Sequence, residues 1–155
     1  MFHPQKSANF LFSLPPSNNC AILNKIIGKG EGSMHINESA ENYLETILRL
    51  SKVRPVVRSV DIAEELGYKK SSISVAMKHL REAEHITVTK EGFIYLTESG
   101  RNIAEMIFER HELLTTWLMR LGVSEKTASE DACRIEHDIS QESFEAIKNY
   151  ISKNP

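Results

Sequence analysis

The sequence predicts a mostly α-helical protein, and three observations support this prediction. Apolar residues recur at the three- and four-residue spacing of helices along most of residues 38–151. The strict alternation typical of strands is confined to ITVTKEGFIYLT at 86–97. Capping and helix-ending residues stand between the periodic stretches. We therefore expect a helical chain with a single β-hairpin.

Length and composition limit the class of protein. At 155 residues, 41% hydrophobic and 26% charged, the chain suits one compact domain, or a small domain with a second helical unit. Cys20 and Cys133 lie too far apart in sequence to suggest a disulfide framework, which favours a reduced, cytoplasmic protein. No apolar run approaches the roughly 20 residues of a membrane span, so we expect no membrane partner.

Residues 1–33 differ from the rest of the chain. They show no helical or strand period, and Pro15-Pro16 interrupts any element. They lack the charged start, apolar centre and cleavage site of a secretory signal. Two interpretations are open: an upstream extension of a protein that naturally starts at Met34, or a disordered tail.

The first periodic stretch predicts a helix over Glu38–Leu50 with one buried face, closed off by Pro55. Ser59 is then expected to cap a short helix that has acidic residues in its first turns. Gly67 is expected to end that helix, because glycine readily adopts the left-handed backbone found there.

A second short helix is predicted from about Lys70 to Ala83. Its apolar face, at i, i+3, i+4 and i+7, is formed by Ile73, Ala76, Met77 and Leu80. Two short helices about a glycine-containing turn are typical of a helix-turn-helix, whose second helix enters the major groove of DNA. Small hydroxyl residues would allow close approach, and lysines would contact phosphates. The predicted DNA-binding residues are Ser59, Lys69, Lys70, Ser71, Ser72, Ser74 and Lys78.

The alternating stretch that follows predicts a hairpin turning at Glu91-Gly92, the wing of a winged helix-turn-helix domain. Residues 52–90 carry eight Lys/Arg against five Asp/Glu; the net charge of the chain is −2, so the remainder carries −5. A local basic zone suits a module that binds double-stranded operator DNA. A generic helical bundle with a hairpin is the alternative, but the order of the elements favours DNA binding.

The second half of the chain predicts helices only. Thr97 is expected to cap a helix over Glu98–Leu121, which has His111 inside its apolar stripe. Ser124 and Ser140 are expected to cap two further helices. So large an apolar surface on few helices suggests a symmetric homodimer, which a helix-turn-helix protein needs to read a two-fold operator.

The heptapeptide DACRIEH, residues 131–137, carries the most distinctive chemistry. On a helix, Cys133, Glu136 and His137 stand at i, i+3 and i+4 and can meet at one point. Thiolate, carboxylate and imidazole are transition-metal ligands, but buried cysteine is also a common small hydrophobe. Taken alone, these residues fit either a metal-binding face or an ordinary helix.

Residues 36 to about 153 resemble the diphtheria toxin repressor and manganese transport regulator family of metal-dependent transcriptional repressors. The matching stretches are ENYLETI (41–47), SVDIAEELG (59–67), RHELL (110–114) and DACRIEH. The resemblance implies a winged helix-turn-helix DNA-binding domain over 34–97, an all-helical metal-binding and dimerisation domain over 98–155, and a divalent transition metal, Mn²⁺ or Fe²⁺, as cofactor. Transferred by position, the ligands of manganese-type members fall on Asn42, Glu45, His111, Cys133, Glu136 and His137.

The implied ligand set mixes two branches of this family. The first-helix ligand, an Asp in manganese sensors and a Met in iron sensors, is Asn42 here. Glu45 resembles the manganese branch, whereas Cys133 resembles the iron branch. A thiolate favours iron, zinc or cobalt and the oxygen ligands favour manganese, so the residues leave both iron(II) and manganese(II) open.

Two further departures concern the iron branch. Its second metal site falls on Thr115 and Ser129 beside His111, which does not favour that form of the site. Its third, SH3-like domain is not expected, because the sequence ends at Pro155.

We therefore expect a cytoplasmic regulator that represses metal-uptake genes and binds operator DNA as a homodimer when loaded with metal. One alternative is a winged-helix regulator that responds to a non-metal signal. A metal hydrolase would need an open coordination position and a substrate cleft, and HExxH is missing, so neither enzymatic activity nor a small-molecule substrate is expected. A redox switch would need an exposed thiol of low pKa at Cys133.

Overall fold

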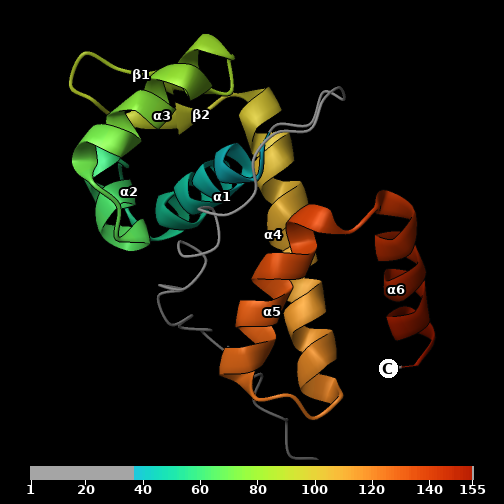
Figure 1. The fold of residues 1–155 in the computed structure, drawn as a ribbon. Coiled ribbons are helices and arrows are strands. Elements are labelled where there is room, and N and C mark those ends of the chain that lie inside the picture. Colours follow the sequence, from blue (N-terminus) through green and yellow to red (C-terminus); the bar gives the residue numbers. More distant parts are fainter. Residues whose placement is uncertain (1–36, 155) are drawn as a thin grey trace, which may run out of the picture.

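Residues 37–154 are described by the computed structural model, and they form six helices and one two-stranded sheet (Figure 1). Residues 1–33, to which the two interpretations above apply, lie outside this range. In chain order, the elements are α1 (Glu38–Val53), α2 (Ser59–Leu66), α3 (Lys70–Glu82), β1 (Ile86–Val88), β2 (Ile94–Leu96), α4 (Glu98–Arg120), α5 (Glu125–Asp138) and α6 (Gln141–Lys153). The predicted mostly α-helical class and order of elements are confirmed. None of the six helices combines the length and apolar character needed to cross a bilayer.

Helix α1 follows from its capping and its apolar spacing. The side-chain oxygen of Asn37 accepts a hydrogen bond from the backbone N–H of Ala40 at 2.9 Å, which satisfies one free donor of the first turn. Glu38 and Glu41 place negative charge near the positive end of the helix dipole. The helix continues three residues past the predicted end and stops at Arg54, because a residue before proline is disfavoured in a helix.

Helices α2 and α3 form the predicted helix-turn-helix. The prediction that Ser59 caps α2 is wrong by one residue: Ser59 is already helical and Arg58 is the N-cap. The carboxylate of Asp61 accepts a hydrogen bond from the backbone N–H of Arg58 at 2.8 Å, so the helix begins one residue earlier. Gly67 ends α2 with φ +67°, as predicted.

The hairpin is anchored to the helix-turn-helix at its base. Strands β1 and β2 are antiparallel, with Ile86 opposite Leu96 and Val88 opposite Ile94. The backbone N–H of Ile94 also donates to the carbonyl of Val57 at 2.8 Å, which links β2 to the loop after α1. The connection between the strands includes Gly92, whose φ of +83° favours glycine. The predicted wing is therefore present.

One hydrophobic core joins α1, α2, α3, the hairpin and the first part of α4. Its largest fully buried members are Leu44, Ile47, Val57, Ile62, Ile73 and Ile86. Ala104, on α4, belongs to the same core. The early turns of α4 therefore pack with the elements that precede it.

The start of α4 is bonded directly to the loop that follows α3. The hydroxyl of Thr97 donates to the carbonyl of Glu84 at 2.8 Å, and its backbone N–H donates to the carbonyl of His85 at 3.0 Å. Thr97 also caps α4 as predicted, accepting from the N–H of Gly100 at 3.1 Å. A side chain at Gly100 would overlap with the carbonyl oxygen of His85, so this contact requires glycine.

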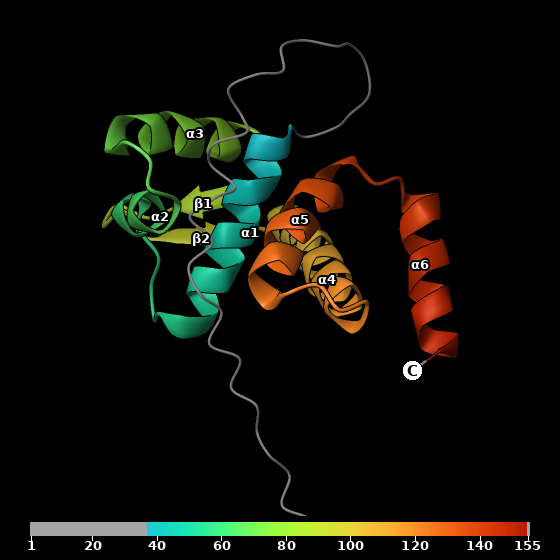
Figure 2. The same cartoon turned by 60° about the horizontal axis from the view of Figure 1, so that its bottom comes forward.

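The remaining helices are arranged around α4. Helix α1 packs along α4 on one side, and α5 packs along its later turns (Figures 1 and 2). Figure 2 shows α1, α4 and α5 grouped together, with α6 to one side. Ser140 caps α6 as predicted, accepting from the N–H of Ser143 at 3.1 Å, and Phe144 is the buried residue of α6.

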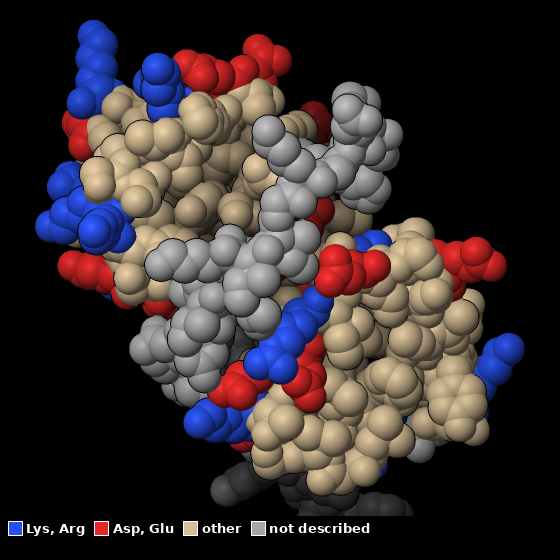
Figure 3. Space-filling model, viewed as in Figure 1, with Lys and Arg blue, Asp and Glu red and all other residues tan. Residues whose placement is uncertain are grey.

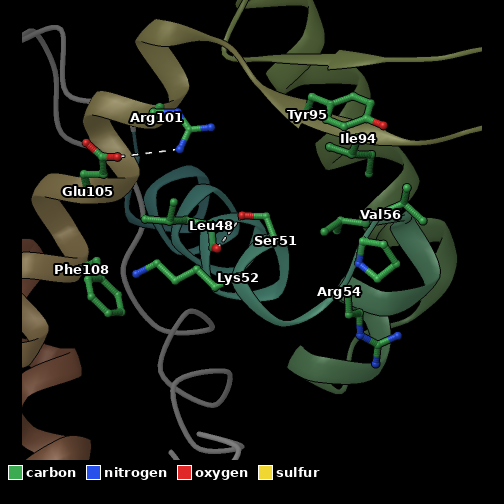
Figure 4. A pocket seen from close by; sticks show the side chains of 12 residues that line it. Leu48, Ser51, Lys52, Arg54, Val56, Ile94, Tyr95, Arg101, Glu105 and Phe108 are labelled. Carbon is green, nitrogen blue, oxygen red and sulfur yellow. Dashed lines mark hydrogen bonds and ion pairs between the residues drawn. The ribbon is translucent and has the colours of Figure 1, made fainter. Parts of the chain in front are cut away.

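The end of α1 also contacts α4 across a cavity of about 480 Å³ that is lined by both helices, β2 and the α1–α2 loop (Figure 4). The ammonium group of Lys52 lies 3.6 Å from the ring centre of Phe108 on α4. Arg101 pairs with Glu105 at 3.8 Å, and Arg54 pairs with Asp61 at 2.8 Å. The cations around this cavity already have partners within the fold, and the contact of Lys52 with Phe108 braces α1 against α4.

Candidate metal centre

Ligand-type side chains from three helices meet between α1, α4 and α5. Glu45 of α1, His111 of α4 and Glu136 of α5 offer ligand atoms that all lie within 4.8 Å of one another. A second group, Cys133, Glu136 and His137, meets the same criterion along α5. Glu136 belongs to both groups, so its carboxylate lies between them.

The structure brings together five of the six predicted metal ligands. These five are Glu45, His111, Cys133, Glu136 and His137. Asn42 is also buried on α1, at 7% exposure. Among the residues that the structure describes, no hydrogen bond joins the Asn42 side chain to the other five. The role of Asn42 as a metal ligand stays a prediction.

Glu136 is the most buried member of the centre, with 0% of its side chain exposed. Its Oε2 lies 2.7 Å from Nδ1 of His111. Its Oε1 lies 3.3 Å from Nε2 of His137, but without the geometry of a hydrogen bond, and both atoms are buried without a hydrogen-bond partner. Buried polar atoms without a partner are costly and require an explanation. A carboxylate oxygen and an imidazole nitrogen facing the same point fit a divalent cation.

His111 connects α4 to α5. Besides its contact with Glu136, its Nε2 lies 3.3 Å from the hydroxyl of Ser129. Ser129 therefore lies beside His111, as predicted. Thr115, one turn after His111, is buried and its hydroxyl has no hydrogen-bond partner. Neutral hydroxyls at these two positions offer a cation less than carboxylates would.

His137 has a partner that the sequence analysis missed. Its Nδ1 lies 2.8 Å from Oε2 of Glu41 on α1, and its side chain is only 3% exposed. The spacing of Glu38, Glu41 and Glu45, by three and then four residues, places all three on one face of α1. That spacing was the available signal, but first-turn acids are also expected from the helix dipole alone.

Burial and charge raise the pKa of Glu45 to about 7 from its ordinary value of 4.5. Loss of solvent is the largest cause, and repulsion from the Glu136 carboxylate adds to it. Attraction to His111, Arg49 and His137 offsets part of the increase. The carboxylates of this centre thus repel each other in the absence of a further positive charge.

The two histidines respond to the same carboxylates. Burial lowers the pKa of His111, but the hydrogen bond to Glu136 and the charges of Glu136, Glu45 and Glu112 together outweigh burial and raise the pKa above 6.5. Burial likewise lowers the pKa of His137, and the hydrogen bond to Glu41 with the charges of Glu136 and Glu41 raises it. The centre as a whole therefore favours bound positive charge.

Arg110 holds the end of α5 that carries Glu136 and His137. It is 8% exposed, and its Nη1 donates to the carbonyls of Glu136 at 2.9 Å and Ile139 at 3.2 Å. Its Nη2 donates to Oε1 of Gln141 at 2.9 Å. A cation at the carbonyl end of a helix is favoured by the helix dipole, so Arg110 fixes the α5–α6 corner against α4.

The predicted DNA-binding residues lie on the outer face of the helix-turn-helix. Helix α3 buries Ile73, Met77 and Leu80, and this leaves its opposite face free. The exposed predicted residues are Lys69, Lys70, Ser71, Ser72, Ser74 and Lys78, whereas Ser59 is half-buried. Figure 3 shows basic side chains standing out at this end of the molecule, with acidic ones among them.

Two family models together match most of the chain. Residues 35–92 match the model described as iron dependent repressor, N-terminal DNA binding domain. Residues 97–154 match the model described as iron dependent repressor, metal binding and dimerisation domain. The chain belongs to the iron-dependent repressor family. This repressor is thus a metal-dependent transcriptional regulator that binds DNA and dimerises, with a winged helix-turn-helix followed by a helical domain, as the resemblance implied.

Curated relatives agree with this assignment. An uncharacterised HTH-type transcriptional regulator of Methanocaldococcus jannaschii is 34% identical over 121 residues, which are 76% of this repressor and 96% of that protein. The HTH-type transcriptional regulator MntR of Geobacillus kaustophilus is 34% identical over 113 residues, 73% of this repressor and 80% of MntR.

A solved structure of a manganese-dependent transcriptional repressor in complex with manganese is 28% identical, with a TM-score of 0.67. The alignment covers 73% of this repressor and 52% of that chain. The fold of the repressor thus corresponds to about half of that longer protein.

Proposed function

We propose that the repressor binds Mn²⁺ or Fe²⁺ between α1, α4 and α5, and that the loaded homodimer binds operator DNA and represses metal-uptake genes in the cytoplasm, without enzymatic activity. The observation that carries this proposal is the pair of buried, unpartnered atoms, Oε1 of Glu136 and Nε2 of His137, which face each other at 3.3 Å. Both are atoms that divalent transition metals accept as ligands.

The proposed ligands are those that the structure gathers, together with the remaining predicted position. Glu45, His111 and Glu136 form a group of oxygen and nitrogen ligands, which suits Mn²⁺. Cys133 is disulfide-bonded in the structure, so it would add a soft ligand that suits Fe²⁺ only after reduction to the thiolate. A bound divalent cation would supply the positive charge that these carboxylates lack. The proposed metal-binding residues are Asn42, Glu45, His111, Cys133, Glu136 and His137.

The packing explains how occupancy could affect DNA binding. Helix α1 belongs to the core of the helix-turn-helix, whereas α5 packs chiefly on α4. A metal ion bound by both Glu45 and Glu136 would tie α1 to α5. It would thereby favour one arrangement of the two recognition helices in the dimer. The size of this population shift is limited by the difference in metal affinity between the arrangements.

The proposed DNA contacts use the exposed face of α3 and its approach. Lys69, Lys70 and Lys78 would hold phosphates, while the small side chains of Ser71, Ser72 and Ser74 would let α3 enter the major groove. Ser59, at the start of α2, would contact the backbone of the DNA.

The test is operator binding under control of metal. DNA from upstream of the repressor gene and of neighbouring metal-transport genes would be titrated at fixed salt, with reductant, in Mn²⁺, in anaerobic Fe²⁺ and in chelator. We expect binding only with metal, and we expect Glu136→Ala and His137→Ala to abolish the metal response while circular dichroism stays unchanged. Glu125→Ala, at an exposed position on the same helix, is the control.

Two results would contradict the proposal. Equal operator binding in chelator and in metal would favour a regulator that responds to a non-metal signal. An undiminished metal response in both variants would show that the ion binds elsewhere.

A further inference from the structure

We propose that Glu41 is a positioning residue of the metal centre, whose carboxylate orients the His137 ring so that Nε2 faces Glu136. This proposal rests on the proposed function and extends it. Glu41 is on α1 and His137 is on α5, 96 positions later in the chain. The contact therefore also connects the helix-turn-helix core to the helix that carries three of the proposed ligands.

The hydrogen bond determines which ring nitrogen is free. Nδ1 of His137 lies 2.8 Å from Oε2 of Glu41, and a carboxylate can only accept, so Nδ1 must carry the proton. In the neutral ring, Nε2 then keeps its lone pair. A histidine that binds a metal through one nitrogen usually donates its other N–H to a carboxylate or carbonyl. Glu41 meets that requirement.

The surroundings of Nε2 are a second, independent observation. This nitrogen is buried, has no hydrogen-bond partner and lies 3.3 Å from the equally unpartnered Oε1 of Glu136. A histidine held only for packing would be expected to satisfy both nitrogens. His137 also belongs to the ligand group with Glu136 and Cys133.

Neighbouring residues on α1 contact different parts of the metal centre. Adjacent residues of a helix point about 100° apart, so Glu41 and Asn42 cannot approach His137 in the same way. Glu41 makes the bond, and its side chain is 13% exposed. Glu45, one turn later, reaches His111 and Glu136 instead. Helix α1 thus contacts the centre twice, through Glu45 and through the partner of His137.

The alternative is that Glu41 and His137 form an ordinary ion pair that only stabilises the packing of α1 on α5. In that case, replacing Glu41 would lower the melting temperature but would leave the ring tautomer and the intrinsic metal affinity unchanged. Stability alone therefore cannot test the proposal.

The test uses the full chain with Glu41→Ala and Glu41→Gln, and Glu38→Gln as the matched control. Glu38 is an exposed acid in the first turn of the same helix. NMR of the imidazole nitrogens in the metal-free protein, at a pH where His137 is neutral, should show the Nδ1–H form in the wild type and Glu38→Gln. Glu41→Ala should shift His137 towards the Nε2–H form. Glu41→Gln, which keeps an acceptor, should shift it less.

Metal affinity provides the second measurement, by competition of Mn²⁺ with a fluorescent chelator. We expect Glu41→Ala to weaken Mn²⁺ binding by about 10- to 100-fold, the usual effect of losing such a partner. Glu41→Gln should lose less, and Glu38→Gln should remain within about twofold of the wild type.

The proposal is overturned if Glu41→Ala keeps the Nδ1–H tautomer, or if it binds Mn²⁺ as tightly as Glu38→Gln. Failure of the proposed function has a different result: the wild type would bind operator equally well in chelator and in metal. The tautomer and Mn²⁺ affinity would then still decide the role of Glu41, because neither measurement involves DNA.

Discussion

Helix α1 contributes to two buried regions of opposite character. In the hydrophobic core, Leu44 and Ile47 are at most 1% exposed among other apolar side chains, and this packing needs nothing from outside the chain. In the metal centre, Glu45 is buried beside a second carboxylate, and two ligand-type atoms lack partners. The comparison teaches that the stability of the fold and its dependence on a ligand come from different faces of the same helix.

The largest expected effect is the loss of core packing. We expect Leu44→Ala to lower the free energy of unfolding by about 2–5 kcal/mol, because a fully buried leucine leaves a cavity, and metal should not reduce that loss. Urea unfolding with Mn²⁺ and with chelator would measure both values. Val53→Ala, at a position 78% exposed, is the control. A loss that disappears when Mn²⁺ is added would show that the two regions are not separate.

At Glu45 we expect a smaller effect in the opposite direction, an increase in the free energy of unfolding when the residue is replaced by glutamine. Its pKa in the folded chain, about 7, lies above the ordinary 4.5. Protonated Glu45 therefore stabilises the fold at low pH, and this contribution is lost as pH rises from about 4.5 to about 7. Glutamine cannot ionise, so metal-free Glu45→Gln should be more stable than the wild type at pH 8, on the order of 1–3 kcal/mol.

The same variant should lose its response to metal. The wild type should gain about 2.7 kcal/mol at a Mn²⁺ concentration 100 times the dissociation constant, whereas Glu45→Gln should gain much less. Thermal unfolding at pH 5 and pH 8, with and without Mn²⁺, would measure both the gain in metal-free stability and the loss of stabilisation by metal. Glu64→Gln is an exposed control. Equal stability of Glu45→Gln and the wild type at pH 8 would contradict the prediction.

The smallest effect on stability is expected on the DNA-binding face. Lys78 is 63% exposed and lies 3.8 Å from Glu82, a pair that contributes less than about 0.5 kcal/mol. Lys78→Ala should nevertheless weaken operator binding and reduce the slope of log affinity against log salt by about one. Lys126→Ala removes a similar exposed pair, at 4.0 Å, from α5. A salt slope equal to that of Lys126→Ala would exclude a phosphate contact.

Much of the fold could be predicted because it depends on local patterns. Apolar spacing located α1 to α4, and Thr97 and Ser140 cap their helices as predicted. The start of α2 was misplaced because Asp61, rather than Ser59, makes the capping contact. Where two polar residues compete for a cap, small differences in geometry decide, and spacing does not reveal them.

The candidate site was predicted only in part, because its geometry depends on contacts between distant helices. Cys133, Glu136 and His137 could be grouped from their spacing along one helix. The pairing of Glu41 with His137 could not, because it depends on how α1 and α5 both pack on α4. In the sequence, Glu41 is equivalent to Glu38, and only tertiary packing distinguishes the first from an ordinary surface acid.

The bonded start of α4 has a consequence for protein engineering. Because Gly100 lies against the carbonyl of His85 and Thr97 bonds to the same loop, the 23-residue helix α4 begins inside the DNA-reading half and ends inside the sensing half. A chimera that exchanges the α4 and α5 part of the metal centre should therefore be joined within α4, after Phe108, and not at the apparent boundary near residue 97, and Glu41 and Glu45 of α1 should be matched to the new part. A graft made there would keep the native register between the new sensor and the recognition helix.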